Sequence, residues 1–386
     1  MQVKPKPIQP DIRAIARLIK PSGNLVQGQN EVALHPMLEQ AINEVVHAGL
    51  NHYSFFEGVD ELRRAVAEKV KMYNGVTINP DAQPLELMIT PGGTGGIVTL
   101  SHAYLRGASA VLFEPYYPYH KKTLATCDAR TDVVKLRGDN LELDVDELRR
   151  VCRAGVARAE YPTKAIVVCS PANPTGRVYS RDELQSILAV AEEFDLMIVS
   201  DEVYEHFTLT PEDHISMASL PGAFERTITV NSFSKSWAVS GWRLGYLYGP
   251  GQLLSKVGQL GNIYYVCTPT PLQHALARVL LSDLSYYDKL REDFGRKRAI
   301  LRDALESVGF KVYDSRSAFY LWARIPQRFA NALDLNDVLI QKAGVAAVPG
   351  SAFMDDPDED VYMRWCFARE DAMLEEATAH IVRALS

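Results

Sequence analysis

Cysteine is scarce in this sequence, and the cysteines present form no recognisable pairs. The five are spread over 386 residues without a Cys-x-x-Cys pair or a spacing typical of a zinc site. Their odd number, and the apolar residues 166–168 before Cys169, favour reduced and mostly buried thiols. The sequence therefore predicts a cytoplasmic protein with no disulfide framework and no bound metal.

Long hydrophobic runs and a strong charge of one sign are missing as well. No apolar stretch approaches the roughly 20 residues that cross a bilayer, and residues 1–10 have prolines and lysines in place of a leader's apolar core. The formal net charge is −7, and the basic clusters at residues 149–150 and 296–298 are short. Such clusters are typical of solvated helix faces. We expect neither a membrane nor a nucleic acid as a partner.

The order of apolar segments predicts an α/β fold. Residues 36–48 and about 59–73 have the i, i+3, i+4 spacing of helices. Farther along, short apolar segments alternate with helical patterns such as residues 181–194, where Ser180 and Glu183 form a capping-box pattern. This alternation is typical of a mostly parallel sheet with helices on both faces. The predicted strands are residues 85–90, 109–113, 131–135, 165–169, 196–200, 227–230 and 246–248.

The pattern changes after about residue 282. A long charged amphipathic helix over residues 284–308 is followed by short strands and two further helices, which indicates a smaller α+β unit. We therefore expect three parts. They are an N-terminal segment (1–47) that packs with the small domain, a large domain (48–283) and a small C-terminal domain (284–386).

A lysine among hydroxyl groups follows one of the predicted strands. Lys235 ends the run Asn-Ser-Phe-Ser-Lys after residues 227–230, and a stretch with small residues leads from it to Arg243. Small residues let the backbone approach a ligand closely, and Ser232 and Arg243 are donors for a phosphate. A single lysine near an arginine is most often a surface charge, so this motif needs support from others.

Polar residues also follow the two preceding strands. Asp201 and Tyr204 come at and after the end of residues 196–200, where open α/β sheets bind ligands, although an aspartate there could equally cap a helix. Asn173 lies in Ser-Pro-Ala-Asn-Pro-Thr-Gly after residues 165–169, and a plain Asn-Pro turn also explains it. Each motif alone is weak, but all lie at strand ends of one predicted sheet.

A glycine-rich turn joins the first predicted strand to a helix. The sequence from Thr90 to Gly96, Thr-Pro-Gly-Gly-Thr-Gly-Gly, would present backbone N–H groups at a helix N-terminus, which suits a phosphate. It fits neither the GxGxxG nor the GxxxxGK[ST] pattern. Dinucleotides and nucleoside triphosphates are therefore disfavoured as ligands.

Together these motifs make the sequence resemble the class I/II aminotransferases, which are fold-type I enzymes that use pyridoxal 5′-phosphate (PLP). The most specific stretches are residues 170–176, 200–204 and 232–245, and the resemblance extends over nearly the whole chain. It implies a large domain with a mostly parallel central sheet, plus a smaller α+β domain. It also implies that the enzyme moves an amino group between an L-amino acid and a 2-keto acid through a Schiff base on Lys235.

The resemblance further implies a role for each motif. Lys235 would bind PLP and later transfer the proton at the substrate α-carbon. Asp201 would pair with the pyridinium nitrogen, Asn173 and Tyr204 would bond the ring oxygen, and Tyr117 would stack on the ring, although core packing also explains this tyrosine-rich run. The residues implied at the phosphate are Gly93, Thr94, Ser232, Ser234 and Arg243.

Substrate and subunit contacts are implied in the same way. Arg364, a charge inside an apolar segment, matches the arginine that binds the substrate α-carboxylate, with Asn173 beside it. Gly28 lies near the N-terminal loop that contacts the substrate. Tyr53 resembles the tyrosine that reaches the phosphate of the neighbouring subunit, which implies a homodimer as the active unit.

The departures from the family pattern fall in the substrate loops. Gly28 is followed by Gln-Asn-Glu where Glu-Pro-Asp is frequent, and Ser317 replaces the glycine of Gly-Ala-Phe-Tyr. The second cation that some members use for a dicarboxylate has no clear match. The sequence therefore disfavours a dicarboxylate specialist and leaves the amino donor and keto acceptor open.

Two other functions are compatible with parts of this pattern. A PLP-dependent lyase, synthase or oxidase would use the same stabilised carbanion, and release of ammonia without a keto acceptor would identify a lyase. A non-catalytic regulator on the same fold would typically have lost the lysine or gained a DNA-binding segment. Retention of Lys235, Asp201, Asn173 and Arg364 favours an enzyme.

Overall fold

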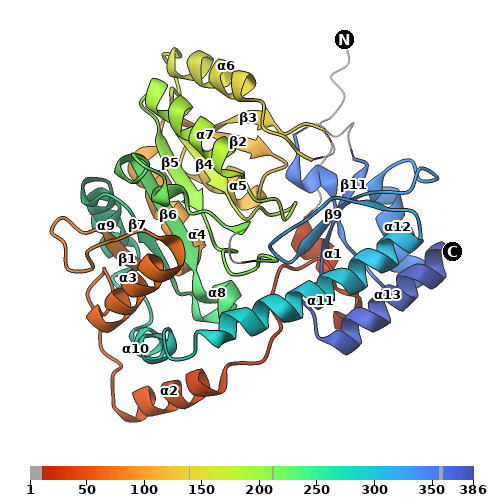
Figure 1. The fold of residues 1–386 in the computed structure, drawn as a ribbon, viewed down its shortest axis with the longest axis horizontal. Coiled ribbons are helices and arrows are strands. Elements are labelled where there is room, and N and C mark those ends of the chain that lie inside the picture. Colours follow the sequence, from red (N-terminus) through yellow and green to blue (C-terminus); the bar gives the residue numbers. More distant parts are fainter. Residues whose placement is uncertain (1–10, 139, 211–212, 356–359) are drawn as a thin grey trace.

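The chain folds into two units, each built on its own sheet (Figure 1). The computed structural model describes residues 11–138, 140–210, 213–355 and 360–386. The larger unit contains a seven-stranded sheet and the smaller unit a four-stranded one. The long helix α11 (Ser285–Ser307) runs from the large unit into the small one.

The large sheet has the strand order β1-β7-β6-β5-β4-β2-β3. Only β7 runs against the others, because it pairs antiparallel with both β1 and β6, whereas the remaining pairs are parallel. The carboxyl ends of the parallel strands and the start of β7 therefore meet at one edge. The strands are β1 (Leu87–Thr90), β2 (Ser109–Glu114), β3 (Arg130–Lys135), β4 (Thr163–Cys169), β5 (Met197–Asp201), β6 (Thr227–Ser232) and β7 (Gly245–Tyr248).

Helices cover both faces of this sheet, so its central strands are buried on both sides, as continuous apolar segments predict. One face is covered by α4 (Gly92–Tyr104), α5 (Pro118–Thr126) and α9 (Gly251–Tyr265). The other is covered by α6 (Val145–Val156) and α7 (Arg181–Glu193). The predicted α/β class with a mostly parallel sheet is confirmed.

The small unit is an antiparallel sheet covered by helices. Its strands, in the order β10-β11-β9-β8, are β8 (Lys311–Val312), β9 (Tyr320–Arg324), β10 (Val348–Pro349) and β11 (Tyr362–Cys366). The covering helices are α11, α12 (Ala332–Ala343) and α13 (Asp371–Leu385). Leu305, Leu339, Trp365 and Leu374 are among the fully buried residues of the core that these elements enclose.

The N-terminal segment divides its contacts between the two units. Its first part, with α1 (Ile12–Ala16), packs against the small unit around Trp322 and Phe353. By contrast, α2 (Pro36–His47) packs on α10 (Thr270–Val279) of the large unit, because its apolar stripe faces that helix. The expected packing of residues 1–47 on the small domain therefore needs correction for α2, and residues 1–10 lie outside the described residues.

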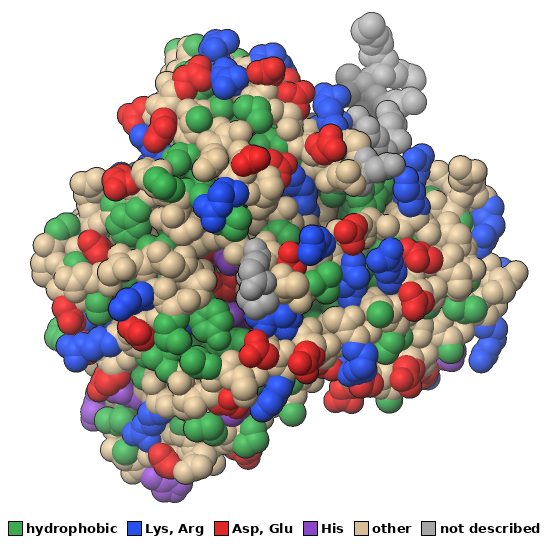
Figure 2. Space-filling view, in the orientation of Figure 1, with side chains coloured by type: hydrophobic (Ala, Val, Ile, Leu, Met, Phe, Trp, Pro, Cys, Tyr) green, Lys and Arg blue, Asp and Glu red, His purple; other side chains and the backbone are tan. Residues whose placement is uncertain are grey.

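Charges of both signs are interspersed over the face of the molecule seen in Figure 2. Within the described part of the chain, every helix is too short or too polar to span a bilayer. The thiols of Cys127, Cys152, Cys169, Cys267 and Cys366 are all free.

Candidate active site

A cavity opens at the carboxyl edge of the large sheet, where open α/β sheets bind ligands. The predicted site residues that line it are Gly93, Thr94, Tyr117, Asn173, Asp201, Tyr204, Ser232, Ser234, Lys235 and Arg243. Residues far apart in the sequence thus surround one space.

The strand arrangement explains this meeting. Asn173 follows β4, Asp201 ends β5, and Lys235 follows β6, so all three lie at the carboxyl ends of adjacent parallel strands. Because β7 runs the other way, Arg243 reaches the same edge by preceding its strand. A single reversed strand therefore adds a cation to a site that parallel strands build.

Lys235 lies in the single-turn helix α8 (Phe233–Ser236), where the Ser232 hydroxyl caps the turn by accepting from the Ser234 N–H (3.2 Å). Its Nζ donates to the carbonyl of Gly28 (2.8 Å). Burial lowers the pKa of Lys235 to about 8, and the positive charge of Arg364 acts in the same direction. Among the described residues no carboxylate forms an ion pair with this amine, so a large share of it is unprotonated and nucleophilic near pH 8.

Asp201 is buried and paired with a residue that the sequence did not point to. One of its carboxylate oxygens lies 2.7 Å from Nε2 of His120 in α5, and the other accepts from the Val203 N–H (3.4 Å). The Tyr117 ring meets the His120 ring edge-on, with centroids 5.2 Å apart. The sequence feature that could have indicated this pair is a histidine shortly after the end of β2, at the same edge of the sheet.

The hydroxyl of Tyr204 lies 2.9 Å from that of Tyr320, which comes from β9 of the small unit. Burial raises the pKa of Tyr204 well above its ordinary value. The phenol therefore stays protonated and can donate a hydrogen bond to a ligand in the cavity.

Arg364 lies in the middle of β11 and is 3% exposed. Its Nη1 donates to Asn173 Oδ1 (2.9 Å) and its Nη2 to the carbonyl of Val26 (2.5 Å). Its buried Nε has no partner, and no carboxylate of the described chain is within ion-pair distance. A buried cation with free donors is costly unless an anion completes it. The arrangement fits a carboxylate bound from the cavity side.

The part of the cavity lining at the start of α4 fits a phosphate. Helix α4 begins there at Gly92, whose φ of +69° and missing side chain let Arg243 lie across the helix start, since a Cβ would come within 2.7 Å of Arg243 Nη2. The buried hydroxyl of Ser234 has no partner. Free N–H groups at a helix N-terminus, a guanidinium and an unsatisfied hydroxyl together suit a phosphate dianion.

Three predicted residues are not part of this lining. Arg364 adjoins it through Asn173, whose Oδ1 accepts from Arg364 Nη1. Gly28 meets the site through its carbonyl, and a Cβ on it would overlap the Tyr320 hydroxyl at 1.7 Å. Tyr53 is 85% exposed and away from the cavity of its own chain.

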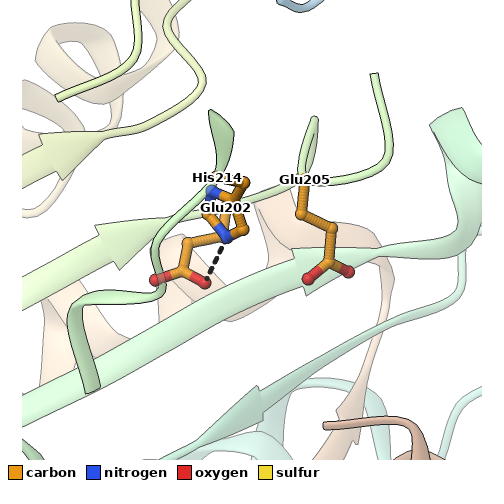
Figure 3. Close-up of side chains that lie close together, drawn as sticks. All are labelled: Glu202, Glu205 and His214. Atoms are coloured by element: carbon orange, nitrogen blue, oxygen red, sulfur yellow. Dashed lines mark hydrogen bonds and ion pairs between the residues drawn. The ribbon is translucent and has the colours of Figure 1, made fainter. Parts of the chain in front are cut away.

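A second group of polar side chains, close in sequence to Asp201 and Tyr204, is drawn in Figure 3. Glu202, Glu205 and His214 approach one another closely enough to resemble a metal site. However, Glu202 accepts from Ser216 and two other donors and faces His214 at 3.2 Å, and Glu205 accepts from Lys69 and Asn74. Each carboxylate oxygen is thus already used within the protein.

Comparisons with known proteins agree with this geometry. The family model described as "Aminotransferase class I and II" matches residues 22–381. Aspartate aminotransferase of Pyrococcus abyssi is 32% identical over 90% of this chain and 87% of its own length. Aromatic-amino-acid aminotransferase 2 of Thermococcus litoralis is 33% identical with the same coverage. The structure of N-succinyldiaminopimelate aminotransferase from Mycobacterium tuberculosis superposes with a TM-score of 0.89 at 31% identity, covering 97% of this chain and 96% of that one.

Proposed function

Because the chain belongs to the class I and II aminotransferases, a PLP-dependent family, we propose that Lys235 binds PLP covalently and is the base of the reaction. The enzyme transfers an amino group between an amino acid and a keto acid. The observation that supports Lys235 is its amine, which lies in the cavity, donates to a main-chain carbonyl and meets no carboxylate of the described chain.

The bound cofactor supplies an electron-withdrawing ring that stabilises negative charge on the substrate α-carbon. In this chain Asp201, kept in place by His120, would hold a proton at the ring nitrogen. Lys235 Nζ would take the proton from the substrate α-carbon and pass it on to the cofactor. Asn173 and Tyr204 would donate to the ring oxygen, and Tyr117 would pack on the ring.

The start of α4 would hold the phosphate. The N–H groups of Gly93 and Thr94 and the side chains of Ser232, Ser234 and Arg243 would bind it. The observation that favours this phosphate position is the unpartnered buried hydroxyl of Ser234, which lines the same cavity as the guanidinium of Arg243.

Arg364 binds the substrate α-carboxylate, with Asn173 and Gly28 beside it. The cations that line the cavity are Lys235 and Arg243, which would serve as the amine and the phosphate ligand. A second carboxylate on the substrate would therefore meet no cation among the described lining residues. We propose amino donors with uncharged side chains.

The active unit is a homodimer in which Tyr53 reaches the phosphate of the neighbouring site. Tyr53, Phe55 and Ile263 are 85%, 76% and 75% exposed, and apolar side chains so exposed are typical of a subunit interface. The enzyme is cytoplasmic, in keeping with its free thiols. The division into residues 1–47, 48–283 and 284–386 stays a prediction.

A half-reaction screen tests the proposal. The PLP form is mixed with each amino acid, and loss of the visible absorption of the bound cofactor is followed with and without a keto acid. Neutral amino acids should bleach the band, and a keto acid should restore it. Release of ammonia without a keto acid would indicate the alternative, a lyase. Bleaching by aspartate and glutamate alone would contradict the proposed substrate class.

A further inference from the structure

Residues 24–31, which we call the crossing segment, pass from the small unit to the cavity. The carbonyl of Gly28 accepts from Lys235 Nζ (2.8 Å), and that of Val26 accepts from Arg364 Nη2 (2.5 Å). The segment therefore touches, through its main chain, the proposed catalytic base and the proposed carboxylate-binding residue.

Arg369, which follows β11, binds the other carbonyls of the crossing segment. Its Nη2 donates to Gln27 (2.7 Å), its Nη1 to Gln29 (3.2 Å) and its Nε to Asn24 (2.5 Å). Its Nη1 also lies 3.2 Å from a carboxylate oxygen of Glu31. Because Arg369 is 2% exposed, these charge-assisted bonds form away from water, where they are strong.

The other bonds of the crossing segment involve mainly its two ends. Leu25 pairs through its main chain with the small unit, the N–H groups of Val26 and Gln27 donate to Asn24 Oδ1 (3.1 and 3.2 Å), and Asn30 Nδ2 donates to the Lys235 carbonyl (2.9 Å). In the middle, the Gln29 N–H donates to the Gln27 carbonyl (3.0 Å). Arg369 is the side chain that binds the carbonyls of Gln27 and Gln29, the residues on either side of Gly28.

We propose that Arg369 is a positioning residue, which keeps the carbonyls of Gly28 and Val26 directed at Lys235 and Arg364. The inference rests on the function proposed above. Without the crossing segment in place, Arg364 would keep Asn173 as its recorded partner and lose the second contact that orients it toward a carboxylate. Arg369 itself reaches neither the cavity nor a reacting atom.

The test compares Arg369→Lys with Arg298→Lys in the PLP-loaded enzyme. A lysine ammonium cannot reach three carbonyls from one planar group. We expect the KM for a reactive neutral amino acid to rise about tenfold, and kcat at saturation to change less than about threefold, because ground-state orientation is lost. The absorption spectrum of the bound cofactor stays unchanged.

Arg298 is the matched control. It also donates to a main-chain carbonyl of the small unit, that of Ser315, and pairs with Asp314, but does not contact the crossing segment. The KM of the Arg298→Lys enzyme should stay at the wild-type value. Hydrogen exchange in the cofactor-free protein gives a second readout: amides of residues 24–31 should exchange faster in Arg369→Lys and not in Arg298→Lys.

A purely structural Arg369 would reduce the amount of folded enzyme and leave the KM of the remainder unchanged. An unchanged KM in Arg369→Lys would therefore overturn the proposal. If that variant does not fold, Glu31→Gln is tested in its place, because it removes one carboxylate acceptor of Arg369 on a partly exposed side chain. The KM of Glu31→Gln should rise about twofold. An unchanged KM would overturn the proposal. Failure of the wild-type enzyme to transaminate any amino acid would instead contradict the proposed function.

Discussion

Two lysines of the large unit, Lys69 and Lys235, have contrasting surroundings. Lys69 forms an ion pair with Glu205 and donates to Asn74 (3.0 Å) and to the Tyr246 hydroxyl (3.2 Å). Lys235 donates to one main-chain carbonyl and has no ion-pair partner within the described residues. One amine has all its partners inside the protein, whereas the other keeps its capacity for a ligand.

The same contrast separates the two regions as wholes. Around Lys69, the Glu205 carboxylate is held ionised: burial opposes ionisation, but Lys69, through its charge and hydrogen bond, together with His206 and His214 lowers the pKa of Glu205 to about 2. The Ser234 hydroxyl at the cavity and Arg364 Nε beside it are buried without partners. Unpaired buried polar groups are uncommon in folded proteins, so these two support a ligand site together with the cavity itself. Other such atoms occur elsewhere in the described chain, including His214 Nδ1 near Glu202.

The largest effect should follow from Lys235→Met. The variant removes the nucleophile and base, so transamination should fall by about 10⁴-fold or more, and dialysis should remove the visible absorption of PLP. Stability of the cofactor-free protein should not fall at pH 7, because the cost of burying an unpaired amine disappears. Activity assays measure the loss of rate, and urea unfolding measures the stability of the cofactor-free protein. A fall of several kcal/mol in the free energy of unfolding would contradict the claim that Lys235 lacks a stabilising partner.

Lys69→Met is the matched change at the other lysine. It leaves the Glu205 carboxylate buried without its cation, which should lower the free energy of unfolding by about 3–5 kcal/mol. Enzyme that remains folded should still bind PLP with an unchanged spectrum. If Lys69→Met lost the visible absorption of PLP while keeping wild-type stability, Lys69 would belong to the cofactor site, and the contrast with Lys235 would be wrong.

Asp201→Asn should have a smaller effect on rate. The amide cannot hold a charged ring nitrogen, so kcat should fall about 10²-fold or more while PLP remains bound. His120→Gln, which weakens the same contact from behind, should show the same direction with a smaller loss. Equal rates for wild type and Asp201→Asn in single-turnover measurements would contradict the role of Asp201.

The pH dependence of PLP binding by the cofactor-free protein tests the lowered pKa of Lys235 directly. Only the unprotonated amine attacks the carbonyl group, so capture by the cofactor-free protein should speed up as pH rises, with a midpoint near 8 in place of the ordinary 10.5. Because Arg364 contributes to lowering the pKa of Lys235, Arg364→Gln should move this midpoint upward. A stopped-flow pH series measures both, and a midpoint above 10 would mean that the amine is not held as described.

Local patterns predicted much of the fold and of the site. The apolar strands, the Ser180 capping box and the motif residues at strand ends depend on neighbours in sequence, and the structure contains each of them. Helix α9 was not predicted because its three glycines weaken the helical signal. The start and end residues of most elements also differ by one to a few positions.

Contacts between distant residues were beyond such patterns. His120 meets Asp201 across 81 positions, and Lys69 meets Glu205 across 136. Which of two lysines has a carboxylate beside it depends on the packing of whole elements, so the sequence identified Lys235 through family motifs and not through its surroundings. Arg369 gave no signal for the same reason.

The most direct test of the account is to reduce the PLP-loaded enzyme with borohydride, digest it and locate the lysine that carries the pyridoxyl group by mass spectrometry. The account predicts the label on Lys235, in the peptide that contains residues 232–236, and none on Lys69. A label on Lys69 or on any other lysine, with Lys235 unmodified, would contradict it.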